Sequence, residues 1–130
     1  MAHLDAHFDA DLAVILDEDR PGTLAKALGC VGGAGINIDG YAEIGGVVHV
    51  LAPDRRAAHV CLEQSGFRIL QEHQVAVVSV ADEPGAAARV FQALAESHIN
   101  VKYSYLATRN RLVIAADDPE AAIRVLTVVT

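Results

Sequence analysis

The chain has 130 residues, of which 52% are hydrophobic and 21% are charged, so it can bury a core and is not a disordered acidic tail. Its 10 Lys and Arg residues are outnumbered by 17 Asp and Glu residues, and the net charge of -7 argues against nucleic-acid binding. No apolar run reaches the roughly 20 residues of a membrane span, no secretory signal is present, and two cysteines are too few for a disulfide scaffold. These features predict a cytoplasmic protein that contacts neither nucleic acid nor membrane.

The first half of the chain is predicted to alternate strands and helices. Branched apolar residues over 12–16 indicate a strand, and the loop 17–22 contains a proline that suits the first turn of a helix. That helix ends in the glycine-rich segment 32–35. The remaining predicted elements are a strand from Ile36 to Ile44, a turn at Gly45-Gly46, a strand over 47–51, a helix from Asp54 to about Ser65, and a strand over 67–71.

The second half follows the same plan. Residues 75–80 indicate a strand, and an apolar stripe over 87–94 indicates a helix. A hairpin is expected around Arg109-Asn110, and a closing helix is expected over 119–126 with Asp118 as its cap. The partner of the strand over 67–71 would begin just past Thr130. The gap would be filled by residues 126–129, by the N-terminal segment or by another subunit.

An internal repeat relates the two halves. Asp19-Arg20-Pro21-Gly22 returns as Asp82-Glu83-Pro84-Gly85, and Ile36-Asn37-Ile38 returns as Ile99-Asn100-Val101, both 63 positions later. Asp54 and the residues after it return from Asp118, 64 positions later. The repeat predicts a tandem duplication with an N-terminal segment 1–10, a first domain 11–73 and a second domain 74–130, which lacks its last strand unless one of the three candidates supplies it.

These motifs resemble the ACT domain. Asp19-Arg20-Pro21-Gly22-Thr23-Leu24 lies at a strand-to-helix loop and precedes Ala34-Gly35-Ile36-Asn37-Ile38, and the second half carries the related Asp82-Glu83-Pro84-Gly85 and His98-Ile99-Asn100-Val101. The resemblance covers about residues 11–128. It implies an α+β fold with two ferredoxin-like βαββαβ copies, each an antiparallel sheet with helices on one face. It also implies a stand-alone tandem ACT protein that binds an amino acid.

The loop 17–23 has groups that suit such a ligand. The first amide groups of a helix attract a carboxylate, and Gly22 allows a ligand close to the backbone. Carboxylates such as Asp17, Asp19 or Asp39 could pair with an ammonium group. The alternative is that Asp19 and Asp82 only cap their helices.

Asn37 and Asn100 follow the two helices. One amide side chain can donate to a carboxylate and accept from an ammonium group, and the resemblance implies that this strand faces the loop of a neighbouring domain. The alternative is an asparagine that satisfies the turn backbone. The expected ligand-binding residues are Asp17, Asp19, Arg20, Pro21, Gly22, Thr23, Asn37, Ile38, Asp39, Asp82, Glu83, Pro84, Gly85, Asn100 and Val101.

Other reactive side chains show no site pattern. The six histidines lack metal-ligand spacing, so we expect no metal and no cofactor. Cys30 and Cys61 are interpreted as neighbouring core residues, and Tyr103 and Tyr105 as sheet packing. No nucleophile stands beside a base, which argues against an enzyme.

The leading hypothesis is a regulatory protein that senses a free amino acid, or a similar small zwitterion, at an interface between ACT domains. It would form a homodimer and act on a regulated enzyme partner. The alternative is a protein–protein interaction or oligomerisation module without a small-molecule ligand, for which the open edge of the second sheet would be the docking strand.

Overall fold

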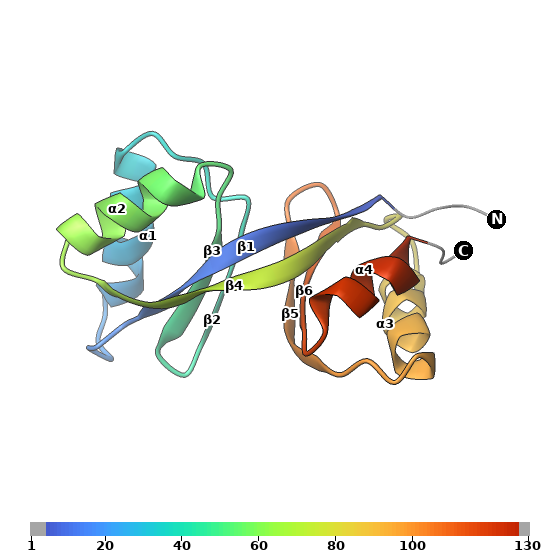
Figure 1. Ribbon diagram of the computed structural model, residues 1–130. Helices are drawn as coiled ribbons and strands as arrows, with labels where there is room; N and C mark the ends of the chain where they lie inside the picture. Colours follow the sequence, from blue (N-terminus) through green and yellow to red (C-terminus); the bar gives the residue numbers. More distant parts are fainter. Residues whose placement is uncertain (1–4, 128–130) are drawn as a thin grey trace. The chain divides into compact units, whose positions relative to one another are not determined.

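Figure 1 shows the computed structural model, which describes residues 5–127. The described chain forms two compact units, which we call the first unit (Ala10–His73) and the second unit (the residues up to Asp9 together with those from Gln74 onward). The elements in chain order are β1 (Ala6–Ile15), α1 (Thr23–Gly33), β2 (Gly40–Ile44), β3 (Val47–Leu51), α2 (Arg55–Gln64), β4 (Arg68–Ser79), α3 (Ala86–Glu96), β5 (Val101–Ala107), β6 (Arg111–Ala116) and α4 (Pro119–Leu126).

The first unit is an antiparallel sheet covered by two helices. β3 pairs with β1, where Leu12 lies opposite Val50, and with β2 on its other side. The beginning of β4 lies beside β1. Alternate residues of β1 and β3, including Leu12 and Val50, pack with Val31 of α1 and Leu62 of α2 in one buried cluster. The opposite sides of these strands carry Asp11 and His49.

Polar contacts join α2 to the start of β4 in the same unit. The Arg55 guanidinium donates to Glu72 at 2.7 Å, and a ring nitrogen of His59 lies 2.8 Å from the other carboxylate oxygen. The hydrogen bond with His59 is the main cause that lowers the pKa of Glu72, with Arg55 adding to it and burial opposing it. Glu72 therefore stays ionised and holds the strand against the helix.

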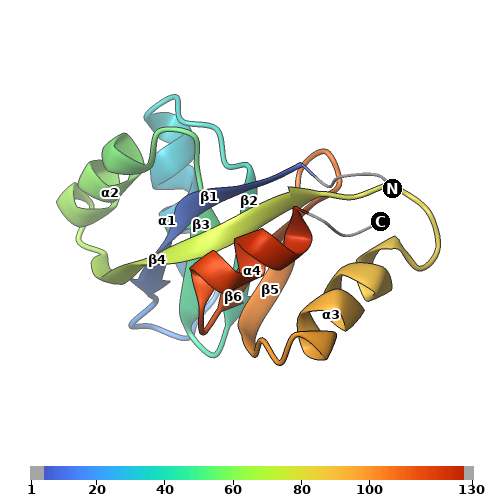
Figure 2. The ribbon, with the colours of Figure 1, turned by 45° about the vertical axis from the view of Figure 1, so that its right-hand side comes forward.

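The second unit repeats this arrangement of elements. β6 pairs antiparallel with β4 and with β5, so Val113 lies opposite both Val77 and Tyr105. Helices α3 and α4, drawn beside these strands in Figure 2, contribute Leu94 and Leu126 to its buried cluster. The α+β class with antiparallel strands in a βαββα order is thus confirmed.

The N-terminal segment supplies the strand that the second unit otherwise lacks. The amide of Ser79 donates to the carbonyl of Asp5 at 3.0 Å, and Ala6 packs against the cluster of the second unit. In the described part of the chain, residues 5–9 of the N-terminal segment lie at this place. Leu126 ends helix α4 instead of forming a strand, and residues 128–130 lie outside the described part of the chain.

Three strands differ from their predicted bounds. β2 begins at Gly40, four residues after the strand expected from Ile36. β1 begins at Ala6, six residues before the strand expected from residue 12. β4 is one strand of 12 residues, where the sequence predicted separate strands over 67–71 and 75–80. Both β1 and β4 contribute residues to the first unit and to the second.

The predicted Gly45-Gly46 turn and the predicted caps at Asp54 and Asp118 are confirmed. Gly45 and Gly46 form the turn between β2 and β3 with φ of +61° and +83°. The Asp54 carboxylate accepts from the amide of Ala57 at 3.1 Å, and that of Asp118 accepts from Ala121 at the same distance. No helix among residues 5–127 combines the length and the hydropathy needed to cross a membrane.

Candidate functional site

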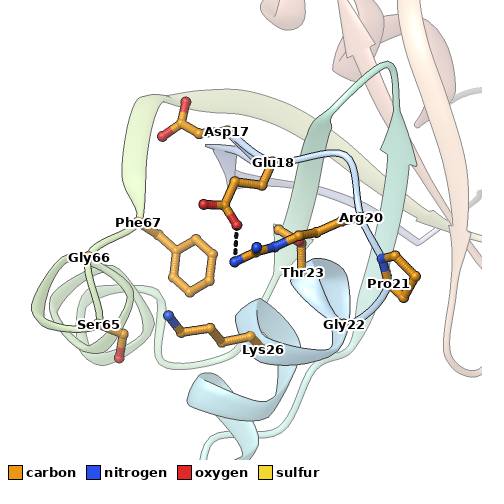
Figure 3. Close-up of a pocket in the computed structure, with 10 residues that line it drawn as sticks. All are labelled: Asp17, Glu18, Arg20, Pro21, Gly22, Thr23, Lys26, Ser65, Gly66 and Phe67. Atoms are coloured by element: carbon orange, nitrogen blue, oxygen red, sulfur yellow. Dashed lines mark ion pairs between the residues drawn. The ribbon is translucent and has the colours of Figure 1, made fainter.

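The loop between β1 and α1 borders a cavity of about 550 Å³ in the first unit. Figure 3 shows the side chains around it, which come from this loop, from the first turn of α1 and from the segment between α2 and β4. Five of the sequence-predicted residues line it, namely Asp17, Arg20, Pro21, Gly22 and Thr23. Five further lining residues were not predicted: Glu18, Lys26, Ser65, Gly66 and Phe67.

Both signs of charge line this cavity. Arg20 forms an ion pair with Glu18, which Figure 3 shows as a dashed line. Asp17 lies 3.5 Å from the guanidinium of Arg68. The Lys26 ammonium stands 5.7 Å from the centroid of the Phe67 ring, close enough for a cation–π contact. The cavity therefore offers carboxylates, cations and one aromatic face within a single unit.

Backbone geometry leaves the start of α1 open to a ligand. Gly22 is the N-cap, with φ of +95°, and no side chain caps the helix. The first amides of a helix have no partner within the helix, and here Thr23 reaches only the carbonyl of Arg20, at 3.3 Å. The alternative that Asp19 caps this helix is wrong.

Asp19 belongs to a neighbouring cavity on the same loop. That cavity has a volume of about 470 Å³ and also includes Glu43, Gly45 and Gly46 of the β2–β3 hairpin. Asp17, Glu18, Arg20 and Thr23 line both cavities. The loop is thus accessible from both sides.

The strand residues predicted to join the loop do not line either cavity. The amide nitrogen of Asn37 donates to the Asp39 carboxylate at 2.7 Å, and Ile38 packs against the buried cluster of the first unit. The Asp39 amide donates to the carbonyl of Leu51. Their role in binding stays a prediction.

The equivalent loop of the second unit differs in its charges. Gly85 is the N-cap of α3 with φ of +86° and no side-chain cap, so Asp82 does not cap the helix either. Arg89, which takes the place of Lys26 in the repeat, is bound by Glu83 at 2.9 Å. This loop therefore neutralises its own cation, whereas Lys26 takes part in none of the ion pairs found among residues 5–127.

The remaining predicted residues of the second unit have structural contacts. Pro84 precedes the N-cap of α3. The amide nitrogen of Asn100 donates to the Asp117 carboxylate at 3.1 Å, its carbonyl accepts from the Asp117 amide, and Val101 packs against the buried cluster. The side-chain amide of Asn100, which was expected to bind a ligand, thus already donates to the carboxylate of Asp117.

A second group of polar side chains was missed by sequence reasoning. Asp11 of β1, His49 of β3 and His73 of β4 bring one ligand atom each to within 4.8 Å of one another. The side chain of Asp11 is fully buried, and those of His49 and His73 are 14% and 21% exposed. The signal in the sequence was a carboxylate directly before the apolar strand over 12–16, where a charge that becomes buried needs partners.

Comparisons with known proteins bear on the fold and the family. Residues 73–129 match the ACT domain family, whereas no curated protein sequence matches the chain. Among solved structures, the chain is similar to a protein from Bacteroides thetaiotaomicron, with 25% identity, a TM-score of 0.80, and coverage of 93% of this chain and 88% of that one. It is also similar to aspartokinase alpha and beta subunits, with 25% identity, a TM-score of 0.63 and 96% of each chain covered.

A third likeness concerns the fold alone. The regulatory subunit of aspartate kinase from Thermus flavus is 19% identical, with a TM-score of 0.60 and coverage of 96% of this chain and 97% of that one. The match to the ACT family spans the chain from the middle of β4 onward. A family match for the first half is therefore still an expectation from the repeat.

Proposed function

We propose that this chain is a regulatory protein that binds a free amino acid, or a similar small zwitterion, in the 550 Å³ cavity at the start of α1. One observation carries the proposal. Carboxylates, cationic side chains and the start of α1, which no side chain caps, all line the same cavity. Its volume lies within the range of about 300–1,000 Å³ that small-molecule sites have. The similar structure from Thermus flavus is named as a regulatory subunit of aspartate kinase, which supports a regulatory role for this chain.

The proposal includes two ACT copies in tandem. The second half matches the family, and the first unit has the same order of strands and helices. Gly22 and Gly85 share a left-handed N-cap without a side-chain cap, and Asp54 and Asp118 share the same capping bond. Equivalent backbone geometry at equivalent repeat positions supports a duplication.

The charges suggest how the ligand would lie. Its carboxylate would accept from the first amides of α1 and lie near the ammonium of Lys26, because a helix start and a cation both favour an anion. Its ammonium would face Asp17 and Glu18. Phe67 would contact the ligand's side chain, so the segment between α2 and β4 would influence which amino acid binds.

Asn37 and Asp39, which do not line the cavity in their own chain, are proposed to contribute to the site from a second copy of the chain. In a homodimer, the segment from Asn37 to Asp39 that precedes β2 in another copy would close the cavity. The second loop, with Asp82 and Glu83, would bind more weakly because Arg89 is already paired. Occupancy would stabilise the assembly that forms the site and so reach a regulated enzyme partner.

A thermal-shift screen against common amino acids at millimolar concentration tests the proposal. A ligand at 100 times its Kd adds about 2.7 kcal/mol, which is several degrees for a chain of this size. Lys26→Met should weaken binding roughly tenfold, since it removes a charged partner. The matched control Arg89→Met changes the equivalent cation of the other loop and should leave the Kd unchanged.

Two outcomes would contradict the proposal. One is that no amino acid shifts the melting temperature, and the other is a shift that Lys26→Met and Arg89→Met affect equally. The first would favour the interaction module. Apolar side chains on β2 give that alternative some support, since Tyr41 is 50% and Ile44 is 70% exposed.

The open strand edge no longer supports the interaction module, because β1 occupies that place. A module of this kind would show a fixed stoichiometry in light scattering that no amino acid changes. A ligand-dependent change in stoichiometry would instead favour the sensor.

A further inference from the structure

Three strands of the first unit bring one carboxylate and two imidazoles together. In the β1–β3 pairing, His49 lies opposite Ala13. Side chains two positions apart on a strand share a face, so Asp11 and His49 are diagonal neighbours on the side of the sheet away from the α1 and α2 cluster. His73 reaches the same group from β4, which lies beside β1.

The separations fit ligands around an ion better than they fit direct hydrogen bonds. Nδ1 of His49 lies 3.6 Å from one Asp11 oxygen, and Nδ1 of His73 lies 3.8 Å from the other. Direct hydrogen bonds of this type rarely exceed about 3.2 Å. Two atoms that each lie about 2.0–2.1 Å from a tetrahedral zinc ion are roughly 3.3–3.4 Å apart.

We propose that Asp11, His49 and His73 bind a divalent transition-metal ion such as Zn²⁺. Two imidazole nitrogens and one carboxylate oxygen form a donor set that suits Zn²⁺ and its transition-metal neighbours better than Mg²⁺ or Ca²⁺, which prefer oxygen alone. Three protein ligands leave a fourth position for water or for another donor.

Burial supports a cation at this place. Transfer of a carboxylate into a fully buried position is unfavourable unless positive charge or hydrogen bonds compensate it, and the Asp11 side chain has no exposed surface. A divalent cation would supply that charge between the Asp11 oxygens and the two rings, whose centroids are 5.7 Å apart. The partial exposure of His49 and His73 provides a route of entry.

The first test uses the full chain without a purification tag, after treatment with a chelator. Calorimetric titration with Zn²⁺ should show one ion per chain. Titration with Co²⁺ should produce the visible absorption of a tetrahedral complex. In the unmutated protein, Zn²⁺ should shift the imidazole NMR signals of His49 and His73 and leave those of exposed His98 unchanged.

Variants then locate the site. His73→Gln and Asp11→Asn should each lower Zn²⁺ affinity by at least about 100-fold, because loss of groups that merely orient a ligand already lowers affinity 10- to 100-fold. His98→Gln is the matched control and should bind as the unmutated chain does. Circular dichroism establishes that each variant is folded.

The proposal is overturned if the chain binds no Zn²⁺, or if Zn²⁺ shifts the signals of other histidines only. Unchanged affinity in His73→Gln would overturn it as well. The NMR result on the unmutated chain decides the question even if both variants unfold. None of these readouts depends on amino-acid binding, so this inference and the proposed function stand or fall separately.

Discussion

The thiol of Cys61 lies 3.4 Å from that of Cys30, where helices α1 and α2 meet. The pKa of Cys61 is raised to about 11, mainly by burial and in smaller part by its hydrogen bond and charge interaction with Cys30. Because only the thiolate is a strong nucleophile, Cys61 is chemically unreactive at neutral pH. The two cysteines therefore act as packing residues, as their placement on neighbouring helices predicted.

Cys61 makes stability depend on pH in the alkaline range. The unfolded thiol ionises near its ordinary pKa of 9.0, whereas the folded thiol stays protonated up to about 11, so its contribution is complete below pH 9 and is lost as pH rises towards 11. We expect the unfolding free energy of the unmutated chain to fall more steeply above pH 9 than that of Cys61→Ala. Urea denaturation at pH 8, 9 and 10 measures this, and parallel profiles would contradict it.

The cluster of Asp11, His49 and His73 is an arrangement that local sequence motifs cannot predict. Its members lie 38 and 24 positions apart along the chain, so no local spacing connects them. They meet because strand register puts Asp11 and His49 on one face and because β4 runs beside β1. Register depends on pairing partners that a single sequence does not reveal.

At the scale of elements, turn chemistry was the most predictable feature. The Gly45-Gly46 turn and the Asp54 and Asp118 caps depend on neighbouring residues only, and all three are confirmed. The alternative that Asp19 and Asp82 cap α1 and α3 is wrong, because Gly22 and Gly85 are the N-caps and take a left-handed conformation. That backbone leaves the preceding aspartates outside capping range.

The left-handed N-caps predict a specific effect of alanine. Gly22→Ala and Gly85→Ala should each lower the unfolding free energy by about 1–2 kcal/mol, because a Cβ disfavours positive φ. The matched control Gly29→Ala lies in an exposed helical position with no atom near the added Cβ and should raise stability by up to about 1 kcal/mol. Urea denaturation measures all three, and equal effects at Gly22 and Gly29 would contradict the prediction.

β4 was predicted as two strands because polar residues interrupt its apolar pattern. Residues 71–74 are Gln, Glu, His and Gln, between half-buried Ile69 and the buried run that begins at Val75. These polar residues lie where the strand leaves the first unit and enters the second. The hydrophobic pattern thus indicated two separate buried clusters. It could not show that a single strand contributes residues to both of them.

At the scale of the molecule, each unit depends on a strand that continues into the other. The repeat in the sequence indicated two halves and a missing strand in the second, but it did not decide which of the three candidates, the N-terminal segment among them, would supply that strand. The place of the N-terminal segment there depends on the pairing of Asp5 with Ser79 and on the packing of Ala6. Neither contact has a counterpart within the repeated motifs.

Deletion of residues 1–9 should therefore weaken the second unit. We expect faster amide hydrogen exchange over 75–79 and a stability loss of about 2–3 kcal/mol, since strand hydrogen bonds contribute roughly 1 kcal/mol each and buried apolar contacts add to this. Deletion of residues 1–4 keeps Asp5 and is the matched control. Equal exchange in the two truncated chains would contradict the role given to β1.

Because β1 contributes residues to both units, the chain could be divided into two fragments that reassemble. Fragments 1–73 and 74–130 would each carry most of one unit, but the second fragment would lack Asp5 and the first residues of β1, which belong to its unit. The first fragment carries these residues beyond its own unit and could donate them in trans, as in donor-strand complementation. Fused to two other proteins, such fragments would report whether those proteins come together.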